Sequence, residues 1–235
     1  MRQILGAILL FTVVFISAAT STRATTTNLA PNQSISLATL IDSNMNVQIA
    51  DKNFGDFFFS YIDNNGNPND NLTRSNVVIT ALSNDFGFGV SFQQPLLAIG
   101  AATNNIVFKY TVTVTDPNFH ISDIHLSITG TSGNGGLGSV SENVFTNGFG
   151  GTSVGTLQAT IPTNGSDVAF ANIVPTVDKL WVQKDVIVAG GGAANGSASI
   201  TIIDQSFSQV PEPSTMVLVG LGLLGLVAVR RKHKS

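Results

Sequence analysis

The sequence predicts an all-β fold, an antiparallel β-sandwich of jelly-roll or immunoglobulin-like topology, with one hydrophobic helix at each end of the chain. Two observations support this prediction. Short apolar and β-branched runs recur between residues 25 and 209, separated by Asn, Gly, Asp and Pro, with little sign of a helical period. The two ends differ, because each carries an uninterrupted apolar run. At 235 residues, the chain is long enough for one such domain with short appendages.

The alternation expected of a strand with one apolar face is clearest at residues 106–114, from Phe108 onward, and at residues 124–128. In the second of these runs, Ile124 and Leu126 share one face and His125 lies on the other. A chain with this many short strands buries one face of each most simply in two packed layers. The expected strands are 46–50, 57–62, 76–82, 88–92, 106–114, 124–128, 140–145, 156–161, 168–173, 180–189 and 199–207.

Charge and cysteine content exclude several classes of function. Residues 25–209 contain 13 acidic and 5 basic side chains, a net charge of −8. A basic surface that could follow a nucleic-acid backbone is therefore excluded. The chain has no cysteine, so a disulfide framework, a thiolate zinc site and a cysteine nucleophile are all excluded.

The N-terminus has the three parts of a signal peptide. Arg2 supplies positive charge, residues 4–16 are apolar, and small and polar residues follow. The apolar run is too short to favour a membrane span. We expect residues 1–24 to be removed by signal peptidase after Ala24, with Ala19 as the alternative cleavage position.

The C-terminus, residues 210–235, ends in an apolar segment followed by positive charge. Residues 215–229 carry no charge and no polar face, which predicts a short transmembrane helix rather than an amphipathic core helix. Its length falls below that of an ordinary span, but flanking basic side chains can reach the interface. By the positive-inside rule, the basic cluster stays cytoplasmic and the middle domain is exported. This cluster is Arg230, Arg231, Lys232 and Lys234.

Val210, Pro211, Glu212 and Pro213 precede this apolar segment. The order of Val-Pro-Glu-Pro, a short Leu/Gly/Val helix and a terminal basic cluster resembles the PEP-CTERM sorting signal of exosortase substrates in Gram-negative bacteria. The resemblance implies export, transient retention in the inner membrane through the C-terminal helix, and cleavage by an exosortase near the Pro-Glu-Pro motif. It also implies a link to extracellular polysaccharide and the cell-surface or biofilm matrix. The alternative is a plain C-terminal anchor with a proline-containing linker.

Two glycine motifs that suggest catalysis lack the required context. The segment 151–155 has the G-x-S-x-G pattern around Ser153, but residues 156–161 alternate like a strand where a nucleophile elbow needs a helix. The segment 133–138 has the G-x-G-x-x-G pattern, but it too is followed by residues without helical character. We interpret 133–138 as a loop and predict no catalytic residues.

Two groups of side chains could hold a metal ion. His120 and His125 lie near Asp116 and Asp123, but further ligands cannot be chosen, so a solvated sheet face is the simpler interpretation and no metal ligand is predicted. Residues 63–70 are rich in oxygen ligands, and they begin like a calcium loop. Proline occupies the place of the glycine that an EF-hand requires, and a turn is the default interpretation. The calcium alternative rests on Asp63, Asn65, Asn67 and Asp70.

The sequence therefore predicts a non-enzymatic exported protein of the surface or extracellular matrix, without a cofactor unless calcium binds. Its expected partners are signal peptidase, exosortase, the membrane and extracellular polysaccharide. The alternative is an adhesion module that binds carbohydrate or calcium, although Tyr61, Tyr110 and Trp181 are few aromatic side chains for a sugar-binding surface.

Overall fold

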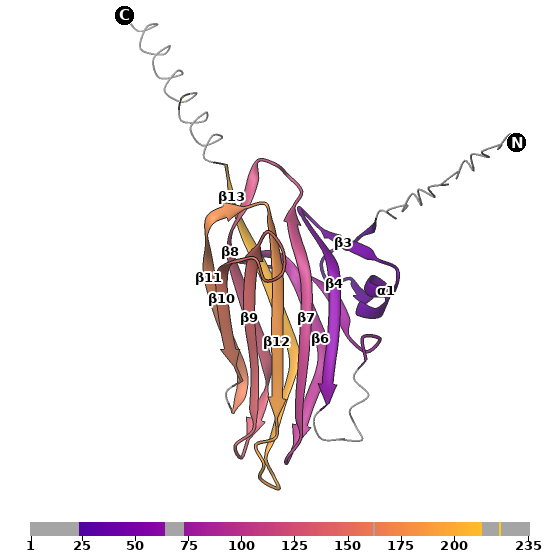
Figure 1. Ribbon diagram of the computed structural model, residues 1–235, viewed down its shortest axis with the longest axis vertical. Coiled ribbons are helices and arrows are strands. Elements are labelled where there is room, and N and C mark those ends of the chain that lie inside the picture. The colour runs from indigo at the N-terminus through magenta and orange to yellow at the C-terminus, as the bar shows by residue number, and fades with distance from the viewer. Residues whose placement is uncertain (1–23, 64–72, 162, 213–220, 222–235) are drawn as a thin grey trace, which may run out of the picture.

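The computed structural model describes residues 24–63, 73–161, 163–212 and 221, and within them the chain folds into two packed β-sheets (Figure 1). The seven-stranded sheet has the order β1-β3-β4-β7-β12-β9-β10, and the six-stranded sheet has the order β11-β8-β13-β6-β5-β2. Neighbouring strands in both sheets are antiparallel, except for β1 and β3, which are parallel. The predicted all-β sandwich is confirmed.

The thirteen described strands exceed the about seven to nine of an immunoglobulin domain. From β6 onward, consecutive strands pass between the two sheets, except β9 and β10, which pair within one sheet. The strands are β1 (Thr25–Asn28), β2 (Ser34–Ser36), β3 (Met45–Ile49), β4 (Lys52–Asp63), β5 (Val78–Asn84), β6 (Gly87–Ile99), β7 (Thr103–Val114), β8 (Phe119–Gly133), β9 (Leu137–Thr146), β10 (Thr152–Thr160), β11 (Asn164–Val177), β12 (Lys179–Ala189) and β13 (Ser197–Pro211).

Each of the eleven expected strands lies on one of β3 to β13, although several observed strands are longer. The prediction missed β1, β2 and the short helix α1 (Leu37–Asp42). Ser36 caps this helix, because its side chain accepts a hydrogen bond from the backbone N–H of Thr39 at 3.1 Å. Leu37 and Leu40 bury the inner face of the helix.

Alternation along the strands builds one apolar core between the sheets. On β12, Leu180, Val182, Val186 and Val188 are buried, and residues on the other face, such as Ile187, are more exposed. Phe54 lies near the middle of an aromatic cluster, with its ring centroid 6.3 Å from that of Tyr110 and 6.0 Å from that of Phe207. Lys184 on β12 breaks the apolar pattern, because it is fully buried.

One glycine motif folds as the sequence context indicated, and the other does so only in part. Ser153 lies within β10, next to a register shift in its pairing with β9, and the strand continues to Thr160. The second motif is partly strand: β8 extends to Gly133, and β9 begins at Leu137. Asn134 and Gly135 have φ values of 50° and 88°, so this connection is a tight turn rather than the longer loop expected. Neither motif leads into a helix.

The described chain begins and ends at the same end of the sandwich, the upper end in Figure 1. There, β13 emerges from the middle of the six-stranded sheet, between β8 and β6. Within the described residues, the structure contains no helix that is long and apolar enough to cross a membrane. The helix predicted over residues 215–229 lies outside the described residues, except for residue 221. Residues 1–23 of the predicted signal peptide also lie outside them.

Candidate functional site

The last strand of the sandwich continues into the Val-Pro-Glu-Pro sequence. β13 pairs with β8 as far as Val210 opposite His120 and Pro211 opposite Phe119. Proline suits this position because it lies at the end of a strand, where a missing N–H interrupts few ladder hydrogen bonds. The first two residues of the predicted sorting segment thus belong to the sheet. We call residues 208–212 the sorting junction.

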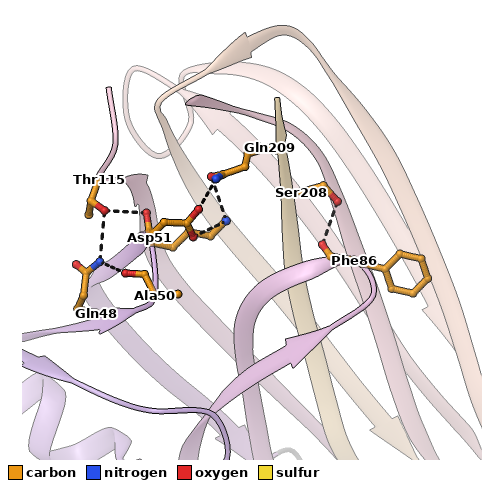
Figure 2. Close-up of polar contacts among 8 residues, drawn as sticks. Gln48, Ala50, Asp51, Phe86, Thr115, Ser208 and Gln209 are labelled. Atoms are coloured by element: carbon orange, nitrogen blue, oxygen red, sulfur yellow. Dashed lines mark hydrogen bonds and ion pairs between the residues drawn. The ribbon is translucent and has the colours of Figure 1, made fainter. Parts of the chain in front are cut away.

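One side of the sorting junction is fixed to the turn between β3 and β4 (Figure 2). The Gln209 amide nitrogen donates to the Asp51 carboxylate, and its oxygen accepts from Lys52 Nζ at 3.3 Å. Lys52 Nζ also lies 3.0 Å from Asp51 Oδ1, in an ion pair in which the lysine side chain is only 2% exposed. Ser208 donates to the backbone carbonyl of Phe86 at 3.0 Å.

Glu212 is fixed to the other side, near the start of β8. Its backbone N–H donates to the carbonyl of Asn118 at 2.8 Å, and one of its carboxylate oxygens lies 3.2 Å from His120 Nε2. The second ring nitrogen of His120 contacts the Asp178 carboxylate. His120 therefore links the glutamate of the Pro-Glu-Pro sequence to the folded domain, a role that its sequence neighbours did not reveal.

The remaining predicted site residues are only partly described. Ala24 is the first residue of the continuous described chain, and Asp63 ends β4. Pro213, the basic cluster and the other three candidate calcium ligands, Asn65, Asn67 and Asp70, lie outside the described residues. Within the part of the chain that the structure describes, no group of three or more His, Asp or Glu side chains could hold a metal ion.

The two histidines that the sequence placed near each other have separate environments. His125 Nε2 contacts Asp123 at 2.9 Å on the outer face of β8, whereas Ile124 and Leu126 face the core. The His125 ring stacks on Phe86, with centroids 4.2 Å apart, and lies 6.1 Å from the Phe170 ring at an interplanar angle of 24°. These three rings form an aromatic row on the outer face of the six-stranded sheet.

Two members of the aromatic row are strongly exposed. Phe170 on β11 is 71% exposed and Phe86, in the turn before β6, is 47% exposed. Exposed aromatic rings beside polar groups can stack on apolar faces of a ligand while hydrogen bonds orient it. The sequence did not reveal this row, because Tyr and Trp are the side chains expected in a sugar-binding surface and because Phe170 meets His125 only through the register of β11 with β8.

Asp204 also lies on β13, paired with Ser91 of β6 and Ser127 of β8. Partial burial raises the pKa of the Asp204 carboxyl, and a hydrogen bond from Ser91 partly opposes this shift. Its partner Ser127 is two residues along β8 from His125, which belongs to the aromatic row.

Comparison with known proteins identifies the C-terminal segment. Residues 209–232 match the family model of the PEP-CTERM protein-sorting motif. The chain carries a PEP-CTERM motif. The resemblance predicted from the tail is thereby confirmed, and the motif marks an exported protein that is sorted towards the cell surface. The match begins at Gln209, so the PEP-CTERM motif overlaps the final strand of the sandwich. No curated protein sequence matches the chain.

Solved structures share only the general architecture. A CBM61 module bound to β-1,4-galactotriose is 8% identical, with 66% of this chain and 88% of that one covered and a TM-score of 0.29. A CBM36 module with calcium and xylotriose is 19% identical, with coverages of 55% and 87% and a TM-score of 0.24. The enzymatically active domain of bacteriophage CBA120 tailspike protein 4 is 15% identical, with a TM-score of 0.31; 65% of this chain matches 19% of that one. This degree of likeness carries no argument about ligands.

Proposed function

We propose that the protein is a non-enzymatic component of the cell surface or extracellular matrix, with the sandwich of residues 25–209 as its mature domain. Signal peptidase would release its N-terminus after Ala24, and an exosortase would cleave near Pro211–Pro213. The observation that carries this proposal is the continuity of the PEP-CTERM motif with β13, because a motif fused to a folded domain makes that domain the exported cargo.

The sorting junction supports the same proposal. Gln209 and Glu212 are both hydrogen-bonded to the sandwich, so the domain reaches the processing machinery with almost no linker before Pro213. After cleavage near this proline, the product would end on a paired strand rather than on a loose tail. Such an end suits a domain that is to be joined to, or packed within, a surface matrix.

The test is to fractionate the native host and to identify both termini of the mature protein by mass spectrometry. We expect a start near Thr25 and an end near residues 210–213. A variant lacking residues 210–235 should accumulate in a different fraction, whereas Phe58→Ala, a change at an exposed side chain of β4, should not alter sorting. An intact C-terminus in the inner membrane, or unchanged distribution of the truncated chain, would contradict the proposal.

A second candidate function is polysaccharide binding by the aromatic row. Phe86, His125 and Phe170 offer adjacent ring faces, and the carboxylates of Asp123 and Asp204 lie on the same side of the sheet. Sugar rings present C–H groups to aromatic faces and hydroxyl groups to carboxylates, so this combination fits a neutral polysaccharide.

Affinity electrophoresis in gels that contain the host's extracellular polysaccharide tests this candidate. Phe170→Ala and Phe86→Ala should each reduce the retardation of the mature protein. Phe58→Ala is the matched control, because Phe58 is 49% exposed and lies in the other sheet. Equal retardation of all three variants and the wild type would contradict binding at the row.

Calcium binding at residues 63–70 remains a proposal with a separate test. Titration calorimetry of the mature protein with calcium should give saturable heat that Asp63→Asn with Asp70→Asn removes. The absence of heat in the wild type would overturn it.

A further inference from the structure

A polar site lies at the centre of the sandwich, where the sequence pattern predicts only apolar side chains. Lys184 occupies the middle of β12 and is paired in register with Glu142 of β9 in the same sheet. Gln205 faces it from β13, in the opposite sheet. All three residues are at most 1% exposed.

The three side chains converge on one nitrogen atom. Lys184 Nζ donates to Glu142 Oε2 and to the Gln205 carbonyl oxygen Oε1. The contact with Oε1 brings the lysine nitrogen next to Cδ, the amide carbon to which that oxygen is bonded. Three polar atoms around the site, Glu142 Oε1, Gln205 Nε2 and Tyr110 Oη, have no hydrogen-bond partner among the described residues. Buried polar atoms without partners are rare in folded proteins and call for an explanation.

We propose that Lys184 and Gln205 become joined by an intramolecular amide bond between Nζ and Cδ, with Glu142 transferring the protons. In this reaction Nζ attacks Cδ, and the carbonyl electrons move to Oε1. Glu142, in its protonated form, donates its proton to Nε2 and accepts one from Nζ, and the electron pair on Oε1 re-forms the carbonyl. The bond between Cδ and Nε2 then breaks, and Nε2 leaves as ammonia with its electron pair. Glu142 is regenerated, and no other reactant is needed.

The surroundings favour this chemistry over a simple ion pair. Burial lowers the pKa of the Lys184 amine, and the neighbouring Glu142 only partly opposes this shift. Burial also raises the pKa of the Glu142 carboxyl, which Lys184 partly opposes. Both shifts favour the neutral amine and the protonated acid, which are the nucleophile and the proton donor. The core holds the reacting groups in place without bulk water, which lowers the entropic barrier.

The proposed bond would also resolve the energetic problem of the site. A buried ammonium group and a buried carboxylate are costly to desolvate, and an ion pair compensates this cost incompletely. Conversion of the amine into a neutral amide removes the positive charge. The bond would connect inner strands of the two sheets, β12 and β13, in a chain that has no cysteine for a disulfide. This inference holds whatever ligand the outer surface binds.

Intact-mass spectrometry of the denatured mature protein tests the bond. The wild type should be lighter than its sequence by one molecule of ammonia, and trypsin should no longer cleave after Lys184. Asn-Gly sequences can also lose ammonia, so Lys184→Met is the control and should have the full mass expected from its sequence. A wild-type mass equal to the sequence mass, or an ammonia loss that persists in Lys184→Met, would overturn the proposal.

Glu142→Gln separates the chemistry from the packing. This variant keeps the size and hydrogen-bonding capacity of the side chain but cannot transfer protons as a carboxyl group does. We expect it to keep its strand content by circular dichroism and to retain the full sequence mass. If this variant still loses ammonia at Gln205, Glu142 is not the group that transfers the protons. The wild-type mass alone then decides whether the amide bond forms.

Discussion

Replacement of Asp51 by alanine should destabilise the end of the sandwich from which the sorting motif emerges. The Asp51 carboxylate accepts hydrogen bonds from Lys52 Nζ and from the Gln209 amide. Alanine removes both acceptors but preserves the Asp51 carbonyl, which binds the backbone N–H of Thr115 at 2.8 Å. The substitution thus isolates the side-chain contacts and leaves the backbone contact intact.

The expected cost follows from the burial of Lys52. Removal of one partner of a fully buried ion pair costs about 3–5 kcal/mol, because the other charge stays desolvated. The Lys52 side chain is 2% exposed but the Asp51 side chain is 26% exposed, so water can partly replace the lost carboxylate. We therefore expect Asp51→Ala to lower the free energy of unfolding by about 2–3 kcal/mol. For a domain of this size, that corresponds to a fall in Tm of about 4–12 °C.

Urea and thermal unfolding of the mature protein measure this cost, and a double-mutant cycle tests its cause. Lys52→Met keeps the length of the aliphatic side chain and removes its charge. Combined with Asp51→Ala, it should recover at least half of the lost stability, because no unpaired ammonium remains buried. Additive losses in the double variant, or a single-variant loss below about 0.5 kcal/mol, would refute the reasoning.

Three further substitutions probe the strand β13 and its neighbours. Because burial raises the pKa of Asp204, the folded state favours the protonated form of this carboxyl. Its protonation therefore contributes to the free energy of unfolding in full below the ordinary carboxyl pKa. This contribution is lost as the pH rises through the raised pKa. Asp204→Asn should therefore raise Tm at pH 7 relative to the wild type, and the difference should vanish near pH ~4, as thermal unfolding across this range would show. Phe207→Ala removes a fully buried ring and should cost about 3–5 kcal/mol in urea unfolding, while Phe58→Ala at an exposed position should cost no more than about 0.5 kcal/mol. Gly89→Ala would place its Cβ 1.7 Å from the backbone carbonyl oxygen of Gln205, so a loss of about 1–3 kcal/mol in the free energy of unfolding is expected, and unchanged stability would show that β13 can shift.

The sandwich was predictable because its strands follow a simple physical pattern. Runs such as 106–114 alternate between core and surface, and this alternation depends only on local geometry. β1 and β2 were missed because they are short and polar, and they are strands only through pairing with β3 and β5. The helix α1 has a serine cap that is visible in the sequence, but its six residues are too few for a helical period to emerge.

The sorting motif was predictable for a different reason, since its elements are contiguous in the chain. The contacts that fix it to the domain were not, because they join residues far apart in sequence, such as Asp51 with Gln209 and His120 with Glu212. The buried site at Lys184 shows the same limit. A lysine within an apolar strand is a visible exception, but its partners on β9 and β13 emerge only from the register of the sheets.

Many of these long-range contacts involve one strand, β13. β13 pairs with β8 as far as Pro211 and with β6 as far as Phe207, offers Gln205 to the core, and fixes Gln209 beside Asp51 where the PEP-CTERM motif begins. A force applied to the C-terminus, from the membrane or from a surface attachment, would act first on the sorting junction and then on Gln205. If the proposed amide bond forms, β13 could separate from its neighbours only as far as Gln205, because beyond it the pull would pass through a covalent bond into the opposite sheet. That bond would therefore hold the part of β13 that precedes Gln205 in its sheet when this chain, which has no cysteine, is pulled from its C-terminus.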